Sequence, residues 1–313
     1  MSAELLLQGA RTLTFVRSRR AAETVAMRTQ EHLSTAGRAD MAERVAPYRA
    51  GYLAEDRREL ERRLDNGELL GVASTNALEL GIDVGGLDAV VMAGFPGTVA
   101  SFRQQAGRAG RRGQSSVAVL VARDEPMDTY LVHHPEALLG TPVENSVFDP
   151  TNPFILRGHV YCAAVERPLS EADVEAFGAR DVVDDLTAAG LLRRRPAGWF
   201  AVPQLDGEIT PESAHASVSL RGGVGEQVMI VDVTDGRLLG TVDAARAMSQ
   251  VHDGAVYIHQ GEYFVVQALD LDDYVALVAP ERPDYSTQAR STTDITILGL
   301  SLIHISEPTR RTP

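Results

Sequence analysis

Strand-like and helical segments alternate over about the first 120 of the 313 residues. Short apolar or β-rich runs lie at residues 11–17, 69–74, 87–94 and 116–122. Helical stretches at residues 19–35, 54–67 and about 98–108 lie between them. Strands that alternate with helices in this way pack as a parallel sheet with helices on its faces. We therefore expect the chain to begin with an α/β domain whose parallel strands are buried.

A proline-rich connector near residue 145 interrupts this pattern. Helical stretches follow at residues 154–166, after the capping-box sequence Ser170–Asp173, and at residues 181–189. A β-hairpin is expected around the turn at residues 196–198. Three helices followed by a hairpin are typical of a winged helix. We assign the first domain to residues 1–145 and the winged-helix domain to residues 146–205.

The remaining sequence changes character again. From about residue 206, short strand candidates are separated by tight turns such as Asp235–Gly236 and Gly261–Glu262. This predicts a small all-β domain, a barrel or a sandwich, over residues 206–299. Residues 300–313 resemble translated sequencing-adapter read-through, so we expect them to be a non-native tail.

All thirty basic residues are arginine, and the chain has no lysine. A phosphate-binding loop of the G-x-x-x-x-G-K-[ST] type needs a lysine ammonium group, and Schiff-base chemistry needs a lysine amine. Neither chemistry can belong to this polypeptide. The net charge of -13 also argues against non-specific coating of nucleic acid, so local arginine clusters matter more than the total charge.

Cysteine and hydrophobic patterning point to a reducing compartment. Cys162 is the only cysteine, which excludes an intrachain disulfide and a cysteine-based zinc cluster. No run of about 18 apolar residues and no basic-then-apolar leader is present. The histidines at 133, 134 and 252 lack spacing partners for a metal. We expect a cytoplasmic protein with no membrane partner and no metal site of its own.

The segment from Gln104 to Gly113 is the strongest chemical signal. Arg108 and Arg111 are three residues apart at a predicted helix end, and the glycines around them allow close approach to phosphate oxygens. This arrangement suits the charge of a triphosphate. A solvated basic helix end is the alternative, since arginine also interacts favourably with a helix C-terminus.

A second segment, residues 73–84, follows the strand at residues 69–74. The carboxyl ends of parallel strands are where ligands bind in open α/β sheets. Thr75 and Asn76 offer groups suited to a phosphate backbone, and Asp83 offers a carboxylate suited to a ribose hydroxyl or an arginine. Ordinary loop capping is the alternative for each of them.

These two segments, preceded by Phe15–Arg19 and by Tyr48–Gly51, resemble the second RecA-like domain of superfamily 2 DEAD/DEAH-box helicases. Phe15–Arg19 resembles motif IV of that family, Ser74–Val84 resembles motif V, and Gln104–Arg111 resembles motif VI. The amino-acid sequences of the motifs and the winged helix that follows them resemble the bacterial mitomycin-repair-factor branch, which is related to RecQ-type DNA helicases. The resemblance covers about residues 5–299.

The resemblance implies roles for particular residues. Arg108 and Arg111 would be the arginine fingers that stabilise the transferring γ-phosphate, and Gln104, Gly81 and Asp83 would contact or sense the nucleotide. The phosphate backbone of one DNA strand would be bound by a further set: Ser18, Arg49, Thr75 and Asn76. Gln104–Gln105 stands where many RNA helicases of the family carry His-Arg, which favours DNA as the substrate.

The family carries its phosphate-binding loop and its Mg²⁺-binding carboxylates on the first RecA-like domain, and this chain has no such segment. We therefore expect a C-terminal part of an ATP-dependent DNA helicase or translocase that acts in DNA repair. Its partners would be the first RecA-like domain and DNA, as a single strand and at a duplex junction. ATP and Mg²⁺ would be cofactors of the whole enzyme, and this part alone would be inactive. The alternative is a non-catalytic nucleic-acid-binding module.

The predicted hairpin of the winged helix carries Arg193, Arg194 and Arg195 on one strand and Trp199 on the other. Such a wing could bind a duplex phosphate backbone and stack its aromatic ring on an unpaired base. In the alternative, the hairpin is a solvated basic wing and Trp199 packs in the core, which is the usual place for a single aromatic residue.

Overall fold

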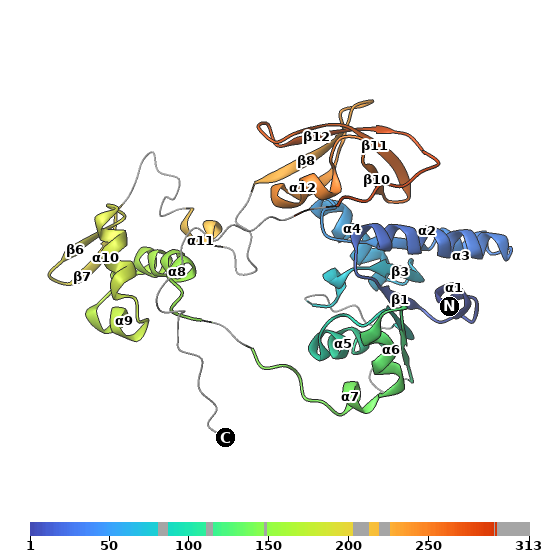
Figure 1. Cartoon of the computed structure of the whole chain (residues 1–313), viewed down its shortest axis with the longest axis horizontal. Helices are drawn as coiled ribbons and strands as arrows, with labels where there is room; N and C mark the ends of the chain where they lie inside the picture. Colours follow the sequence, from blue (N-terminus) through green and yellow to red (C-terminus); the bar gives the residue numbers. More distant parts are fainter. Residues whose placement is uncertain are drawn as a thin grey trace, which may run out of the picture.

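The computed structural model describes residues 1–80, 87–110, 115–146, 149–202, 213–218, 226–290 and 292. Figure 1 shows a sheet domain with a β-rich unit above it, and a helical unit that lies to one side. In the described part of the chain, no helix is long and apolar enough to cross a membrane.

The first domain is built on a parallel five-stranded sheet in the order β2-β3-β1-β4-β5. Its strands are β1 (Thr12–Phe15), β2 (Val45–Tyr48), β3 (Gly71–Ser74), β4 (Ala89–Ala93) and β5 (Val117–Val121). Every residue of β1, β2 and β3 is buried, as expected for parallel strands covered on both faces. The predicted parallel α/β sheet is confirmed.

Helices connect these strands and cover the sheet. They are α1 (Ser2–Leu7), α2 (Arg19–Thr35), α3 (Ala39–Ala42), α4 (Ala54–Asp65), α5 (Val99–Ala106), α6 (Pro126–His133) and α7 (Glu136–Leu139), with the short 3₁₀ turn η1 (Asn76–Leu78) after β3. The side chains of Ser18 and Thr98 cap α2 and α5, because each accepts a hydrogen bond from a backbone N–H of the first turn. Caps of this kind fix where each helix begins beside the sheet edge.

The second unit is a winged helix with its own core. It contains α8 (Pro153–Glu166), α9 (Glu171–Ala176), α10 (Arg180–Ala188) and the hairpin of β6 (Leu192–Arg195) and β7 (Gly198–Ala201), followed by α11 (Ala214–Ser217). The capping box of Ser170 and Asp173 at the start of α9 is confirmed. Cys162 is buried in this core together with Trp199.

The third unit is a mixed sheet in the order β10-β11-β12-β8-β9, with one helix beside it. Its elements are β8 (Gln227–Asp232), β9 (Leu238–Asp243), α12 (Ala244–Gln250), β10 (Val256–His259), β11 (Glu262–Asp270) and β12 (Val275–Pro280). Ala247 and Val251 pack α12 against the strands. The predicted small β domain is confirmed in its strands, but the helix α12 was not predicted.

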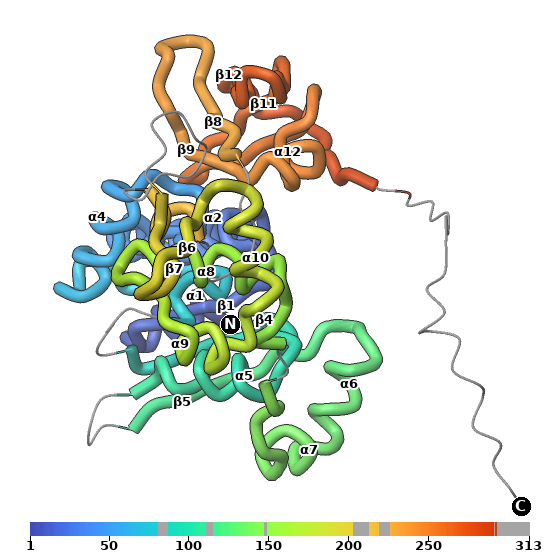
Figure 2. The backbone as a smooth tube through the Cα atoms, turned by 90° about the vertical axis from the view of Figure 1, so that its left-hand side faces the viewer, coloured from blue at the N-terminus to red at the C-terminus, as the bar shows by residue number. Residues whose placement is uncertain are grey.

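The β-rich unit packs directly on the first domain. The amide of Thr241 donates to the carbonyl oxygen of Gly51 at 3.0 Å, and Tyr52 forms an isolated β-bridge with Gly240. A side chain at residue 240 would collide with the Gly51 carbonyl, so only glycine permits this approach. Figure 2 shows the β-rich unit, with α12 and its strands, above α2.

Candidate nucleic-acid interface

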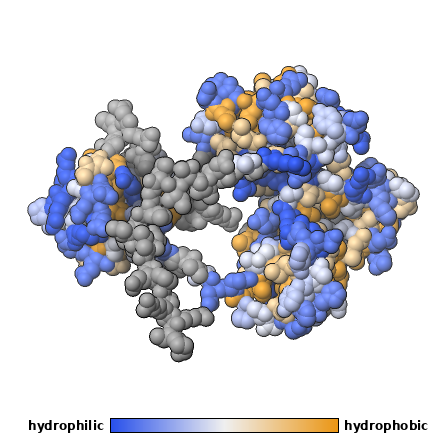
Figure 3. Space-filling model, in the orientation of Figure 1, coloured by the Kyte–Doolittle hydropathy of each residue, from blue (hydrophilic) through white to orange (hydrophobic). Residues whose placement is uncertain are grey.

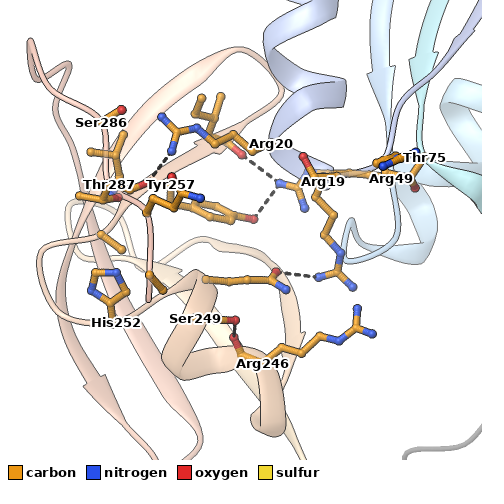
Figure 4. Close-up of a pocket in the computed structure, with 18 of the residues that line it drawn as sticks. Arg19, Arg20, Arg49, Thr75, Arg246, Ser249, His252, Tyr257, Ser286 and Thr287 are labelled. Atoms are coloured by element: carbon orange, nitrogen blue, oxygen red, sulfur yellow. Dashed lines mark hydrogen bonds between the residues drawn. The ribbon is translucent and has the colours of Figure 1, made fainter. Parts of the chain in front are cut away.

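A cleft of about 710 Å³ lies where the first domain meets the β-rich unit. The first domain contributes residues 17–20, 49–50 and 75–76, and the β-rich unit contributes residues between 246 and 258 and residues 286–289. Figure 3 shows hydrophilic side chains gathered where these two parts meet. Figure 4 shows the side chains that line the cleft.

Sheet topology explains why the predicted strand-binding residues meet in this cleft. β1 and β3 are parallel neighbours with Phe15 opposite Ser74, so both strands end at the same edge of the sheet. Ser18 follows β1, and Thr75 and Asn76 follow β3. Asn76 is exposed, whereas Thr75 is 8% exposed. The three residues line one wall of the cleft, and their contact with nucleic acid stays a prediction.

Arginine side chains give the cleft its charge. Arg19 and Arg20 begin α2, and Arg246 lies on α12. Among the described residues, no carboxylate lies within ion-pairing distance of these three guanidinium groups. Burial, with Arg49 and Arg246 nearby, lowers the pKa of Arg19 below its ordinary value. A group of like charges without paired carboxylates is suited to an anionic ligand.

We call this site the arginine cleft. It is defined by Ser18, Arg19, Arg20, Thr75, Asn76 and Arg246. On its far side the Arg20 guanidinium donates to the carbonyl oxygen of Thr287 at 2.6 Å, so residues 286–289 border the cleft beside Tyr257.

The prediction that Arg49 contacts a phosphate backbone is wrong. Its side chain is 2% exposed, and its Nε donates to a carboxylate oxygen of Glu23 at 2.8 Å. Its Nη2 donates to the Tyr257 hydroxyl and to the Ile258 carbonyl oxygen, each at 3.0 Å. The guanidinium group is therefore used inside the protein, where it joins the first domain to the β-rich unit.

The motif V and motif VI segments are joined by a residue that sequence analysis did not single out. Glu79 follows η1 and is 7% exposed. Its carboxylate accepts hydrogen bonds from the Ser101 hydroxyl at 2.7 Å and from the Gln105 amide at 2.9 Å. Its backbone carbonyl accepts a hydrogen bond from Arg108 Nε at 3.1 Å. Glu79, which lies three residues after Asn76, thus holds Arg108, the proposed arginine finger. Only its place within the motif V segment marked it in the sequence.

The other nucleotide-facing predictions divide into two groups. Gln104 is exposed on α5 and does not share the Glu79 network of its neighbour Gln105. Gly81, Asp83 and Arg111 lie outside the described residues, so their roles stay predictions.

The wing differs from its prediction at two positions. Trp199 is 1% exposed in the core of the winged helix, so the prediction that it contacts nucleic acid is wrong and the packing alternative holds. Arg194 stacks over the Trp199 ring at 4.6 Å and donates to Glu171 at 2.8 Å, so it is already partnered. Arg193 and Arg195 are exposed on the opposite face of the strand, and their contact with nucleic acid stays a prediction.

Two family models match the chain. Residues 2–113 match the helicase conserved C-terminal domain, and residues 148–223 match the winged-helix domain of ATP-dependent helicase HRQ1.

Individual proteins are similar over almost the whole chain. ATP-dependent helicase HRQ1 of Saccharomyces cerevisiae is 38% identical over 96% of this chain and 28% of its own length. ATP-dependent helicase YprA of Bacillus subtilis is 40% identical over 95% of this chain and 39% of its own length. The crystal structure of the DUF1998 helicase MrfA bound to DNA and AMPPNP has a TM-score of 0.79 and 38% identity, over 94% of this chain and 41% of that one. The chain therefore spans well under half the length of these relatives.

Proposed function

Because this chain is a C-terminal part of a superfamily 2 helicase of the HRQ1 and MrfA branch, we propose that it binds one DNA strand in the arginine cleft and supplies arginine fingers for ATP hydrolysis. The observation that carries the proposal is the meeting of Ser18, Thr75 and Asn76 in one cleft with arginines that form no ion pair to any described carboxylate. Hydroxyl, amide and guanidinium groups are the donors that proteins use for phosphate oxygens. A cleft of about 710 Å³ has the size of a small-ligand site, which favours an extended single strand over a duplex.

The nucleotide side of the proposal rests on the Glu79 network. The Arg108 guanidinium is held by the Glu79 carbonyl, and Glu79 lies three residues after Asn76. Movement of the Thr75–Asn76 segment on strand binding would therefore be passed to Arg108 through one short turn. Arginine fingers stabilise the negative charge that spreads over the transferring phosphoryl group. Arg108 and Arg111 would supply that charge toward ATP held by a first RecA-like domain.

Magnesium would be held outside the described residues. No group of three histidine, cysteine, aspartate or glutamate side chains in the described part of the chain could hold a metal ion. In this proposal the first RecA-like domain carries the Mg²⁺ ligands and also the lysine of the phosphate-binding loop. A role in DNA repair and a cytoplasmic location belong to the same proposal. By itself the chain would bind the strand without hydrolysing ATP, because it has no lysine for such a loop.

Salt dependence of oligonucleotide binding tests the cleft. We expect the chain to bind a fluorescein-labelled oligothymidine. In the Arg19→Gln variant the negative slope of log K against log salt should become shallower by about 0.7, since each phosphate contact on a single strand contributes that much. The Asn76→Ala variant should weaken binding and leave the slope unchanged, because it removes no charge.

The matched control is Arg28→Gln. Arg28 lies on the same helix α2, is exposed and pairs with Glu31 away from the cleft. Its replacement should leave affinity and slope as in the wild type. Equal slopes for the Arg19 and Arg28 variants would overturn the assignment of the strand to this cleft.

A further inference from the structure

One side of helix α12 in the β-rich unit faces the arginine cleft. Ala247 is buried against the sheet of that unit, and Val251, which follows the helix, is buried with it. Arg246, Ser249 and Gln250 line the cleft instead. Residues three and four apart lie on one face of a helix, which explains why Arg246, Ser249 and Gln250 line it together. The packing of α12 thus presents one cation and two neutral polar groups to the cleft.

This face lies opposite the start of α2. The Arg19 Nη1 donates to the Gln250 side-chain oxygen at 3.4 Å across the cleft. Figure 4 shows the Arg19 and Arg246 side chains extending from the two sides toward the same space. The Asp243 carboxylate raises the pKa of Arg19, but burial and the nearby Arg49 and Arg246 outweigh it and the pKa is lowered. Two guanidinium groups are therefore held near each other with little compensating charge.

The spacing of the two sides is fixed by buried polar contacts. Beside the Glu23–Arg49 ion pair, the other Glu23 carboxylate oxygen accepts from the amide of Gly261 at 3.2 Å. The Tyr52 hydroxyl donates to Glu23 as well. Glu23 and Arg49 both belong to the first domain, and separation of the units would take from these buried groups their partners Tyr257, Ile258 and Gly261. Leaving buried polar groups without partners is costly. The β-rich unit is thereby held against the first domain with α12 facing α2.

We propose that α12 is the second wall of the strand-binding cleft, and that Arg246 binds the phosphate backbone of the strand from the side opposite Arg19. This inference rests on the proposed function and adds the β-rich unit to the strand-binding surface. Its ligand is the single-stranded nucleic-acid backbone that Ser18, Thr75 and Asn76 face from the first domain.

The test is the salt dependence of oligothymidine binding by Arg246→Gln. We expect weaker binding and a salt slope that is shallower by about 0.7, as for one lost phosphate contact. Arg246→Lys should keep the wild-type salt slope, because the positive charge remains. In the double variant Arg19→Gln with Arg246→Gln the salt slope should become shallower by about 1.4, twice the change of each single variant, if the two side chains contact different phosphates of one strand.

The control is Arg237→Gln, which removes the same charge from an exposed side chain of the same unit. Arg237 lies with Asp235 and Glu262 on another surface and does not line the cleft. If Arg246→Gln behaves as Arg237→Gln while Arg19→Gln makes the salt slope shallower, the proposal that α12 is a second wall is wrong and the assignment of the strand to the cleft stands. If neither Arg19→Gln nor Arg246→Gln changes the slope, the proposed function of the cleft fails as well.

Discussion

Replacing Arg108 by alanine in a protein that joins this chain to an ATP-binding RecA-like domain should lower kcat by about 10³- to 10⁵-fold. The reason is that an arginine finger stabilises charge that develops only in the transition state, so its loss slows hydrolysis far more than it weakens ATP binding. Arg108 is held for this task by the carbonyl oxygen of Glu79. Steady-state ATPase rates and nucleotide affinity, measured on the same preparation, check both halves of the prediction.

Arg103→Ala is the matched control for that experiment. Arg103 lies on the same helix α5, is exposed, and its guanidinium donates to the Thr141 carbonyl oxygen rather than to the Glu79 network. Its loss should leave kcat close to the wild-type value. Near-normal turnover of Arg108→Ala would show that Arg108 is a structural residue of the motif V and motif VI contact.

Replacing Trp199 by alanine should destabilise the winged helix by about 3–5 kcal/mol, the usual cost of removing a large aromatic side chain from a core. Trp199 is 1% exposed and packs with Val183, Leu186 and Leu192. For a domain of this size the loss corresponds to a fall in Tm of more than about 10 °C. Thermal unfolding of the chain, monitored by far-ultraviolet circular dichroism, measures this fall in Tm.

Arg193→Ala provides the comparison on the same hairpin. Its side chain is exposed, and surface substitutions of this kind change stability by less than about 0.5 kcal/mol. An unchanged Tm for Trp199→Ala, together with weaker DNA binding, would contradict the buried position and return the indole ring to the nucleic-acid surface.

Regular elements with strong periodicity could be predicted from the sequence, and short or interrupted ones could not. The parallel sheet followed from short apolar or β-rich runs that alternate with helical stretches. β2 was missed because Pro47 lies within it, and proline is tolerated only at an edge of a sheet, where β2 lies. α12 was missed because its seven residues are too few to show a helical period.

Side-chain positions were predictable where chain order places them and not where they depend on distant partners. Ser18, Thr75 and Asn76 follow adjacent parallel strands, so their meeting follows from topology alone. The family resemblance assigned Arg49 to a phosphate. Its actual partners could not be foreseen because they lie far away in the sequence, Glu23 26 positions earlier and Tyr257 208 positions later. Arg246 was overlooked for the same reason, since only the packing of the β-rich unit on the first domain brings it to the cleft.

A crystal structure of this chain with a short oligothymidine tests the central claim most directly. We predict one strand in the arginine cleft, with phosphate oxygens within hydrogen-bonding distance of Asn76 and Arg19 on the first-domain wall and of Arg246 on the α12 wall. A strand bound along Arg193 and Arg195 of the wing, with the arginine cleft free of nucleic acid, would contradict it.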